Sequence, residues 1–203
     1  MHVLRAALYR MVPWKNGLGT TREILRHPAE AEDFDYRLSI AEITQSCAFS
    51  AFPGYERIIM LLDGGGFVLH FADDGTHALD NPHAPFRFDG GAPVSCTVRH
   101  GPSRDLNLMV RRAAASVVCD VVQVAGRVVL APAPGAARLV VALTEGIAVR
   151  SDGQSAALGL WDTACMGGSG LPADAVICES AGSARLFHAV IAPSAGQDDN
   201  RTR

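Results

Sequence analysis

The chain has 203 residues, of which 48% are hydrophobic and 19% are charged, so it can bury a substantial core and is not disordered over most of its length. Its 18 basic and 21 acidic residues argue against an electrostatic nucleic-acid binder. Arg5, Arg10 and Lys15 interrupt the first apolar residues, which indicates neither a signal peptide nor a membrane span. The five cysteines include no CxxC pair and are typical of reduced thiols. We therefore expect a cytoplasmic protein with no membrane or nucleic-acid partner.

Short apolar runs separated by glycine and proline predict an all-β protein. Residues 36–43 alternate, with Leu38 and Ile40 on one face and Arg37 and Ser39 on the other. The apolar runs 57–62 and 67–71 flank the sequence Asp-Gly-Gly-Gly at 63–66, which predicts a β-hairpin.

Residues 72–93 are rich in turn-forming residues and are expected to be mostly loop. Strands are predicted at 95–99 and 105–112, and the second has one apolar face and one polar face. The polar face carries Asp105, Asn107, Met109 and Arg111. It is either a solvated surface or the lining of a binding site.

Beyond residue 113 the sequence becomes rich in alanine and valine and offers few polar candidates for a site. The strands predicted there cover residues 117–124, 127–131, 138–143, 147–150, 157–160, 175–179 and 185–191. No segment has the period of a long helix, so we expect two β-rich halves.

Residues 13–23 form the densest polar and glycine-rich cluster in the chain. This segment brings together an indole, an ammonium, an amide, hydroxyls and a carboxylate, and its glycines would let the backbone approach a ligand closely. It lacks the spacing of a phosphate-binding loop. A loop that caps one end of a barrel is the alternative interpretation.

Several ordered motifs in the first half resemble the HutD/Ves family. They are Pro-Trp-Lys-Asn-Gly at 13–17 with Gly19, Thr20 and Glu23, the strand at 37–43, the segment 49–54 continuing through Arg57 to Gly64 and Gly66, and the segment 101–109 with Arg111. The resemblance covers about residues 1–112, whereas the second half matches only in general character.

This resemblance implies a bicupin, in which two RmlC-like jelly-roll β-barrel domains share one chain. The first barrel would span residues 1–112 and the second residues 113–195, followed by a flexible tail at 196–203. HutD proteins are associated with bacterial histidine utilisation and are thought to bind a pathway metabolite and moderate the operon. Ves relatives are linked to cold and stress responses.

Many cupins bind a metal through two histidines and a glutamate in one motif and a further histidine in a second. Residues 50–57 would carry the first motif here and contain no histidine, and His100 is the only histidine near the second. A transition metal needs three or four converging donors, so we expect neither metal nor cofactor. No serine lies in a nucleophile elbow, and we assign no catalytic residue.

The polar residues of the first half are rich in cations, which predicts an anionic ligand inside the first barrel. The predicted binding residues are Trp14, Lys15, Asn16, Thr20, Glu23, Arg37, Ser39, Phe52, Arg57, Asp105, Asn107, Met109 and Arg111. Trp14 would stack on a planar group of the ligand, and Glu23 and Asp105 would orient the cations.

The leading functional hypothesis is a non-catalytic binding protein that senses or buffers urocanate or formyl- or formimino-glutamate. A metal-independent isomerase or hydrolase acting on a small carboxylate is one alternative, and a Ves-like stress protein is another. Assembly into a homodimer is left open.

Overall fold

The computed structural model describes residues 1–14, 19–31, 33–73, 75–167 and 175–194. These residues form strands and turns, with a single 3-10 turn at Ala6–Leu8. The predicted all-β class is confirmed. In the described part of the chain, no helix is long and apolar enough to cross a membrane.

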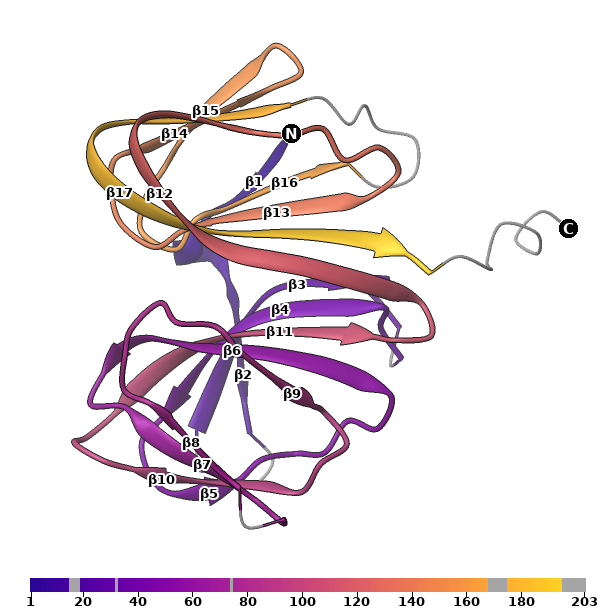
Figure 1. Cartoon of the computed structure of the whole chain (residues 1–203), viewed down its shortest axis with the longest axis vertical. Coiled ribbons are helices and arrows are strands. Elements are labelled where there is room, and N and C mark those ends of the chain that lie inside the picture. Colours follow the sequence, from indigo (N-terminus) through magenta and orange to yellow (C-terminus); the bar gives the residue numbers. More distant parts are fainter. Residues whose placement is uncertain (15–18, 32, 74, 168–174, 195–203) are drawn as a thin grey trace, which may run out of the picture. The chain divides into compact units, whose positions relative to one another are not determined.

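The chain forms two compact units, drawn in Figure 1 with colours that follow the sequence. One is continuous, covers Arg10–Ala113, and is called the central unit below. The other, called the terminal unit, combines Met1–Tyr9 with the chain from Ala114 onward.

The central unit is built from two antiparallel sheets. The larger sheet has the order β2 (Arg10–Pro13), β3 (Gly19–His27), β4 (Tyr36–Ile43), β11 (Ser103–Arg111), β6 (Tyr55–Gly64) and β9 (Phe86–Asp89). The smaller sheet has the order β5 (Cys47–Ala48), β10 (Val94–Val98), β7 (Phe67–Phe71) and β8 (Thr76–Leu79). A buried cluster that includes Ile59 and Leu61 of the first sheet and Phe67 and Leu69 of the second joins the two layers.

The predicted hairpin around residues 63–66 is wrong, because β6 and β7 belong to different sheets. The glycines carry the chain from one sheet to the other. Gly64 has a φ of +99°, and a Cβ built on it would lie 2.3 Å from the carbonyl oxygen of Pro102. Here the glycines permit a left-handed backbone in close contact with the 100–103 segment. In the sequence, glycines with this role look the same as those of a hairpin turn.

Two segments expected to be mainly loop also contain strands. Residues 72–93 include β8 and β9, and the polar cluster at 13–23 runs into β3. β8 and β9 have only four residues each, too few for an alternating pattern to stand out.

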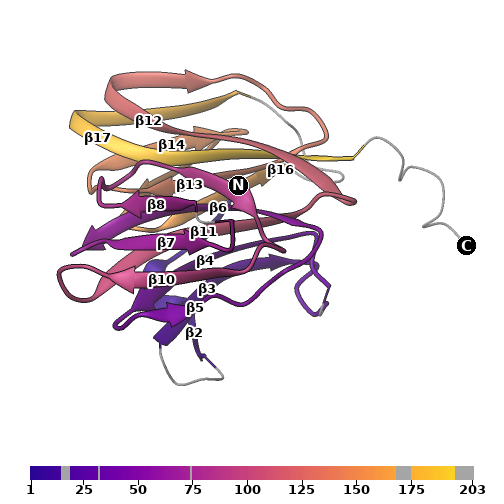
Figure 2. The same ribbon diagram turned by 60° about the horizontal axis from the view of Figure 1, so that its bottom comes forward.

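The terminal unit has the sheet order β1 (His2–Leu4), β16 (Thr163–Gly167), β13 (Ala137–Ala142), β17 (Val176–Pro193), β14 (Ile147–Ser151) and β15 (Gln154–Leu158), with β12 (Ala115–Leu130) paired to β17. The two strands predicted at 117–124 and 127–131 are the single strand β12, with an irregularity between Ala125 and Gly126. Those predicted at 175–179 and 185–191 are both part of β17. Figures 1 and 2 show β12 and β17 as two long, curved strands, which pair antiparallel.

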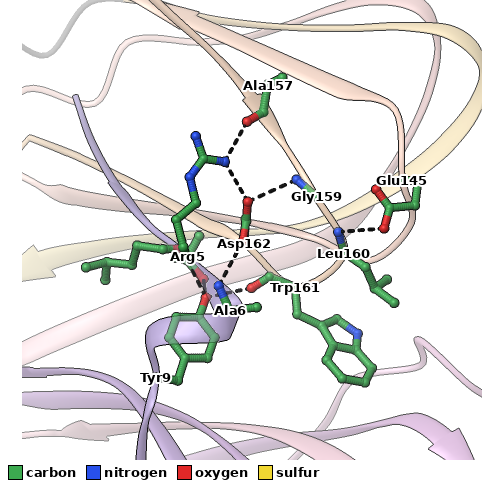
Figure 3. Close-up of polar contacts among 11 residues, drawn as sticks. Arg5, Ala6, Tyr9, Glu145, Ala157, Gly159, Leu160, Trp161 and Asp162 are labelled. Atoms are coloured by element: carbon green, nitrogen blue, oxygen red, sulfur yellow. Dashed lines mark hydrogen bonds and ion pairs between the residues drawn. The ribbon is translucent and has the colours of Figure 1, made fainter.

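The first nine residues do not belong with the unit that follows them, which corrects their assignment to the first domain. β1 pairs with β16, with Val3 opposite Ala164. Asp162 then accepts hydrogen bonds from Arg5 Nη1 at 2.6 Å and from the Ala6 backbone N–H at 2.8 Å (Figure 3). A three-residue strand gives no periodicity from which this pairing could be predicted. The predicted tail at 196–203 lies outside the described residues.

Candidate functional site

The central unit contains a cavity of about 550 Å³, within the usual size range of small-molecule sites. Most of its lining comes from the larger sheet and from residues 48–52. The lining residues are Arg10, Val12, Pro13, Trp14, Thr21, Glu23, Arg26, Arg37, Ser39, Ala41, Ile43, Ala48, Phe49, Ser50, Phe52, Arg57, Asp105, Asn107 and Met109.

Strand alternation places the polar residues of β4 and β11 on the cavity face. Successive residues of a strand point to opposite sides, so Asp105, Asn107 and Met109 share one face. The strand register aligns residues of β4, β11 and β6 in rows across the sheet. Met109 lies between Arg37 of β4 and Arg57 of β6, which gives one row rich in guanidinium groups.

A β-bulge in β3 adds a cation that alternation alone would not place there. The register shifts between Glu23 and Leu25, so that Glu23 lies opposite Ser39 and Arg26 lies opposite Arg37. Glu23 and Arg26 are three residues apart, yet both line the cavity.

Glu23 is the internal counterion of the arginines on this side of the cavity. It accepts hydrogen bonds from Arg10 Nη2 at 3.1 Å and Arg26 Nη2 at 2.9 Å, and its carboxylate lies 4.0 Å from Arg37 Nε. Burial lowers the pKa of Arg37, and Glu23 opposes that shift. These contacts place the Glu23 carboxylate against three arginines of the lining, and its role in orienting them toward a ligand stays a prediction.

Arg57 is the most buried arginine of the lining, with 5% of its surface exposed. Its guanidinium carbon lies 5.1 Å from the ring centres of both Phe49 and Phe88, and Nη1 is 3.4 Å from the carbonyl oxygen of Ser50. Burial lowers the pKa of Arg57 to about 10, although the nearby Asp105 carboxyl opposes the shift. The aromatic residues thus hold a desolvated cation at the cavity.

Asp105 is fully buried at the cavity, and Asn107 is 5% exposed. Burial raises the pKa of Asp105 to about 7, against the opposing influence of the Arg57 guanidinium and the Asn107 side chain. Asp105 can therefore carry or release a proton near neutral pH.

Trp14 packs against the backbone of β3. Its indole N–H donates to Thr21 Oγ1 at 2.8 Å, and a Cβ on Gly19 would lie 3.0 Å from the indole ring. Gly19 therefore accommodates Trp14, whereas the sequence had suggested that the glycines of this segment accommodate a ligand.

The cavity brings together most of the predicted site residues, namely Trp14, Glu23, Arg37, Ser39, Phe52, Arg57, Asp105, Asn107 and Met109. Thr20 and Arg111 are not among the lining residues. Thr20 pairs with Glu42 and precedes Thr21, which does line the cavity, so alternation turns Thr20 away. Arg111, at the end of β11, instead forms an ion pair with Asp35. Lys15 and Asn16 lie outside the described residues.

Sequence reasoning missed several lining residues, including Arg10, Thr21, Arg26, Phe49 and Ser50. Recognising β3 as a strand would have placed Thr21 on the same face as Glu23. Arg26 depends on the bulge, and Arg10 depends on a pairing with Glu23 that has no signature in the sequence.

Among the residues that the structure describes, no three His, Cys, Asp or Glu side chains are grouped as a metal site. The buried thiols of Cys47 and Cys96 lie 3.7 Å apart, beside the cavity residue Ala48. The described side chains of the cavity can bind an anion through guanidinium groups and exchange a proton through Asp105.

Two curated proteins match about half of the chain. Protein Ves of Citrobacter koseri is 47% identical over 100 residues, covering 49% of this chain and 52% of that protein. An uncharacterized 21.2 kDa protein in the hutC 3' region of Pseudomonas putida is 44% identical over 110 residues, covering 54% of this chain and 57% of that protein. These matches span about half the length of both relatives.

Solved structures match nearly the whole chain. A conserved protein of unknown function from Pseudomonas aeruginosa PAO1 gives a TM-score of 0.86 at 31% identity, covering 94% of this chain and 98% of that one. HutD from Pseudomonas fluorescens SBW25 gives 0.80 at 32% identity, covering 95% and 98%. A cupin 2 conserved barrel domain protein from Leptotrichia buccalis, at 12% identity and a TM-score of 0.57 over 90% and 92%, shares the fold. The HutD family model matches residues 6–185, and the chain belongs to the HutD family.

Proposed function

We propose that the chain is a non-catalytic binding protein of histidine utilisation that holds a small anionic metabolite in the cavity of the central unit. Its ligand would be urocanate or a formyl or formimino derivative of glutamate, and binding would buffer or sense that metabolite and so moderate the pathway. The observation that carries this proposal is the excess of guanidinium groups. Among the described lining residues there are four arginines and two carboxyl groups, of which Asp105 is partly protonated near neutral pH.

The relatives support the choice of pathway. One of the similar structures is named HutD, and the Pseudomonas putida relative lies in a hutC 3' region. Family membership supports the association of this chain with histidine utilisation, and the chemistry of the cavity supports the proposed class of ligand.

The row formed by Arg37, Met109 and Arg57 is the proposed site of the ligand carboxylate. Nε of Arg37 and Nε of Arg57 are buried and have no hydrogen-bond partner among the described residues. An anion would oppose the desolvation of both guanidiniums, and each charged hydrogen bond contributes about 1.5–3 kcal/mol. Trp14 would lie against a planar part of the ligand, and Lys15 and Asn16 follow it directly in the chain.

Calorimetric titration with urocanate and with N-formyl-L-glutamate tests the proposal. Arg57→Ala and Lys15→Ala should each weaken binding by about tenfold or more. Arg99→Ala is the matched control, because Arg99 pairs with Asp80 at an exposed position and does not line the cavity. Equal binding by wild type, Arg57→Ala and Lys15→Ala would place the site elsewhere, and absence of anion binding by wild type would refute the proposal.

A metal-independent enzyme acting on a similar carboxylate is the second candidate, favoured by one observation. Asp105 has a pKa of about 7 in the cavity, which suits a general acid or base near neutral pH. Incubation with the same metabolites, followed by NMR, distinguishes the two. Turnover that Asp105→Asn abolishes would favour the enzyme, and stable, unchanged ligand favours the binding protein.

We further propose that both units are cupin barrels, so that the chain is a bicupin, and that it acts in the cytoplasm. The similarity to a cupin barrel protein over most of the chain and the antiparallel sheets of each unit support the first point.

A further inference from the structure

Three oxygen atoms of two residues on the β11 face of the cavity lack a hydrogen-bond donor among the described residues. Both carboxyl oxygens of Asp105 and Oδ1 of Asn107 are buried and have no hydrogen-bond partner among the described residues. The two residues are two positions apart on one strand and line the same cavity. A buried acceptor left without a donor costs about 1–3 kcal/mol, and more when it is charged. A ligand that supplies donors at this face would therefore bind more favourably than one that does not.

The Asn107 amide is near enough to favour the Asp105 carboxylate without meeting hydrogen-bond geometry, and the other donors near Asp105 are engaged elsewhere. Nη1 of Arg57 points to the carbonyl oxygen of Ser50, and its guanidinium is packed among phenylalanine rings. The Cys47 and Cys96 thiols experience the charge of Asp105 but are in hydrogen-bond contact with each other. Burial raises the pKa of both thiols, so neither adds a charge near Asp105 at neutral pH.

The strand register separates these acceptors from the guanidinium row. Asp105 lies opposite Ala41, Asn107 opposite Ser39, and Met109 opposite Arg37. At about 3.3 Å per residue, the Asn107 and Asp105 rows lie about 7 and 13 Å along β11 from the row of Met109. Ala41 is in turn opposite Thr21, the residue that holds the Trp14 indole. The cavity therefore has a cationic end at Arg37 and an acceptor end at Asp105 and Asn107, with the Trp14 ring near the latter, while the charge of the Arg57 guanidinium acts on Asp105 as well.

A ligand that complements both ends carries a carboxylate at one end and an N–H donor at the other. We infer that Asp105 and Asn107 accept hydrogen bonds from an N–H group of the ligand, so that the site selects carboxylates bearing an imidazole or secondary amide over carboxylates of the same shape without one. This inference rests on the proposed function and assigns the specificity of that site to β11.

The experiment compares ligands that differ only in the N–H group. Urocanate is paired with 3-(1,3-oxazol-4-yl)acrylate, in which a ring oxygen replaces the N–H, and N-formyl-L-glutamate is paired with the analogue in which CH₂ replaces the amide N–H. Titrations at about pH 8 keep Asp105 largely ionised and the urocanate imidazole neutral. Wild type should bind the N–H member of the productive pair about tenfold or more tightly, because the analogue leaves buried acceptors unpaired.

Asn107→Leu and Asp105→Asn test the assignment. Asn107→Leu removes an acceptor without changing the charge, so it should weaken the N–H ligand more than the analogue and thereby reduce the preference. Asp105→Asn retains one acceptor and should reduce the preference partly. Arg37→Lys should weaken both ligands of a pair by the same factor and preserve their ratio, since it alters the carboxylate end and Arg37 lies opposite Met109, two rows from Asp105.

Equal affinity of wild type for both members of a pair would overturn the inference while leaving the proposed function intact. The same follows if Asn107→Leu weakens both ligands equally, which is the result of a purely structural role. If no carboxylate binds wild type, the proposed function itself fails, and the inference fails with it.

Discussion

The side chains of Arg57, on β6, and Asp105, on β11, face one cavity, and each opposes the burial penalty of the other. Neither compensation is complete, because the pKa of Arg57 remains lowered and that of Asp105 remains raised. A partly compensated pair of this kind costs stability, and such costs are typical of binding and catalytic sites.

Asp105 should make the protein less stable as the pH rises from about 4 to about 7. Its pKa in the folded state is about 7, well above the value of about 3.9 expected in the unfolded chain. In this window the unfolded state has already lost the proton that the folded state keeps, so the free energy of unfolding falls with pH. Urea unfolding of wild type and Asp105→Asn across this range measures the effect.

The Asp105→Asn variant has no carboxyl at this position, and its stability should decline less over the window. All other titrating groups are common to both proteins, so the difference between the two curves isolates Asp105. Parallel curves would show that Asp105 titrates near its ordinary pKa.

Gly19→Ala should destabilise the central unit and displace Trp14. The added Cβ would lie 2.6 Å from the Glu42 carbonyl oxygen and 3.0 Å from the indole ring, too close for either neighbour to stay in place. Forced overpacking of this kind costs about 1–3 kcal/mol. Thermal unfolding and tryptophan emission report the two effects. Gly182→Ala, with nothing within 4 Å of its Cβ, is the control and should change neither signal.

Asp162→Ala should destabilise the terminal unit more than Arg5→Ala does. Asp162 accepts from Arg5, from the Ala6 N–H and from the Gly159 N–H at 3.0 Å, and it is 7% exposed. Its removal leaves two backbone donors without this acceptor, at a cost of about 2 kcal/mol or more. Arg5 is half-exposed, so its loss should cost about 1 kcal/mol or less. Equal losses in urea unfolding would contradict this account.

These hydrogen bonds also give a pH dependence of the opposite sign. Burial raises the pKa of Asp162, but bonds from Ala6, Arg5 and Gly159 outweigh it, and the net shift is downward. The contribution of Asp162 to stability is therefore present above its unfolded pKa and is lost as the pH falls through its folded pKa. Wild type should thus lose stability on acidification more steeply than Asp162→Ala.

Four thiols of the folded protein, those of Cys47, Cys96, Cys165 and Cys178, should react slowly with a disulfide reagent such as DTNB at about pH 8. Burial raises the pKa of Cys96 and Cys165 to about 12 and of Cys178 to about 11, and it also raises that of Cys47. Little thiolate is then available to attack the reagent. Denaturation should release all five cysteines at once. Rapid reaction of Cys47 or Cys96 in the folded protein would contradict this prediction.

The sequence predicted most of the candidate site because the site follows strand alternation. Arg37 with Ser39, and Asp105 with Asn107 and Met109, reach the cavity by the period of two that is visible in the chain. Prediction failed where the backbone departs from that period. The bulge after Glu23 places Arg26 in the cavity, and the end of β11 directs Arg111 to Asp35.

For the fold, the sequence predicted the long strands but not the short ones. Long, alternating strands such as β4 and β11 were found with nearly correct ends, whereas four-residue strands were missed. The glycines at 64–66 looked like a hairpin turn because local conformation is the same whether the chain returns to its own sheet or crosses to another. That choice depends on contacts with residues far away in the sequence, such as Pro102.

The pairing of β1 with β16 has a consequence for biosynthesis. His2 is synthesised before the central unit, and its partner Cys165 follows only after the whole of that unit has been made. Residues 10–113 are continuous and can fold during translation, while β1 must wait unpaired for the strand that completes its sheet. A fragment that begins at Ala114 would lack both β1 and the donors Arg5 and Ala6 to Asp162, so the terminal unit cannot be separated from the rest by a single cut.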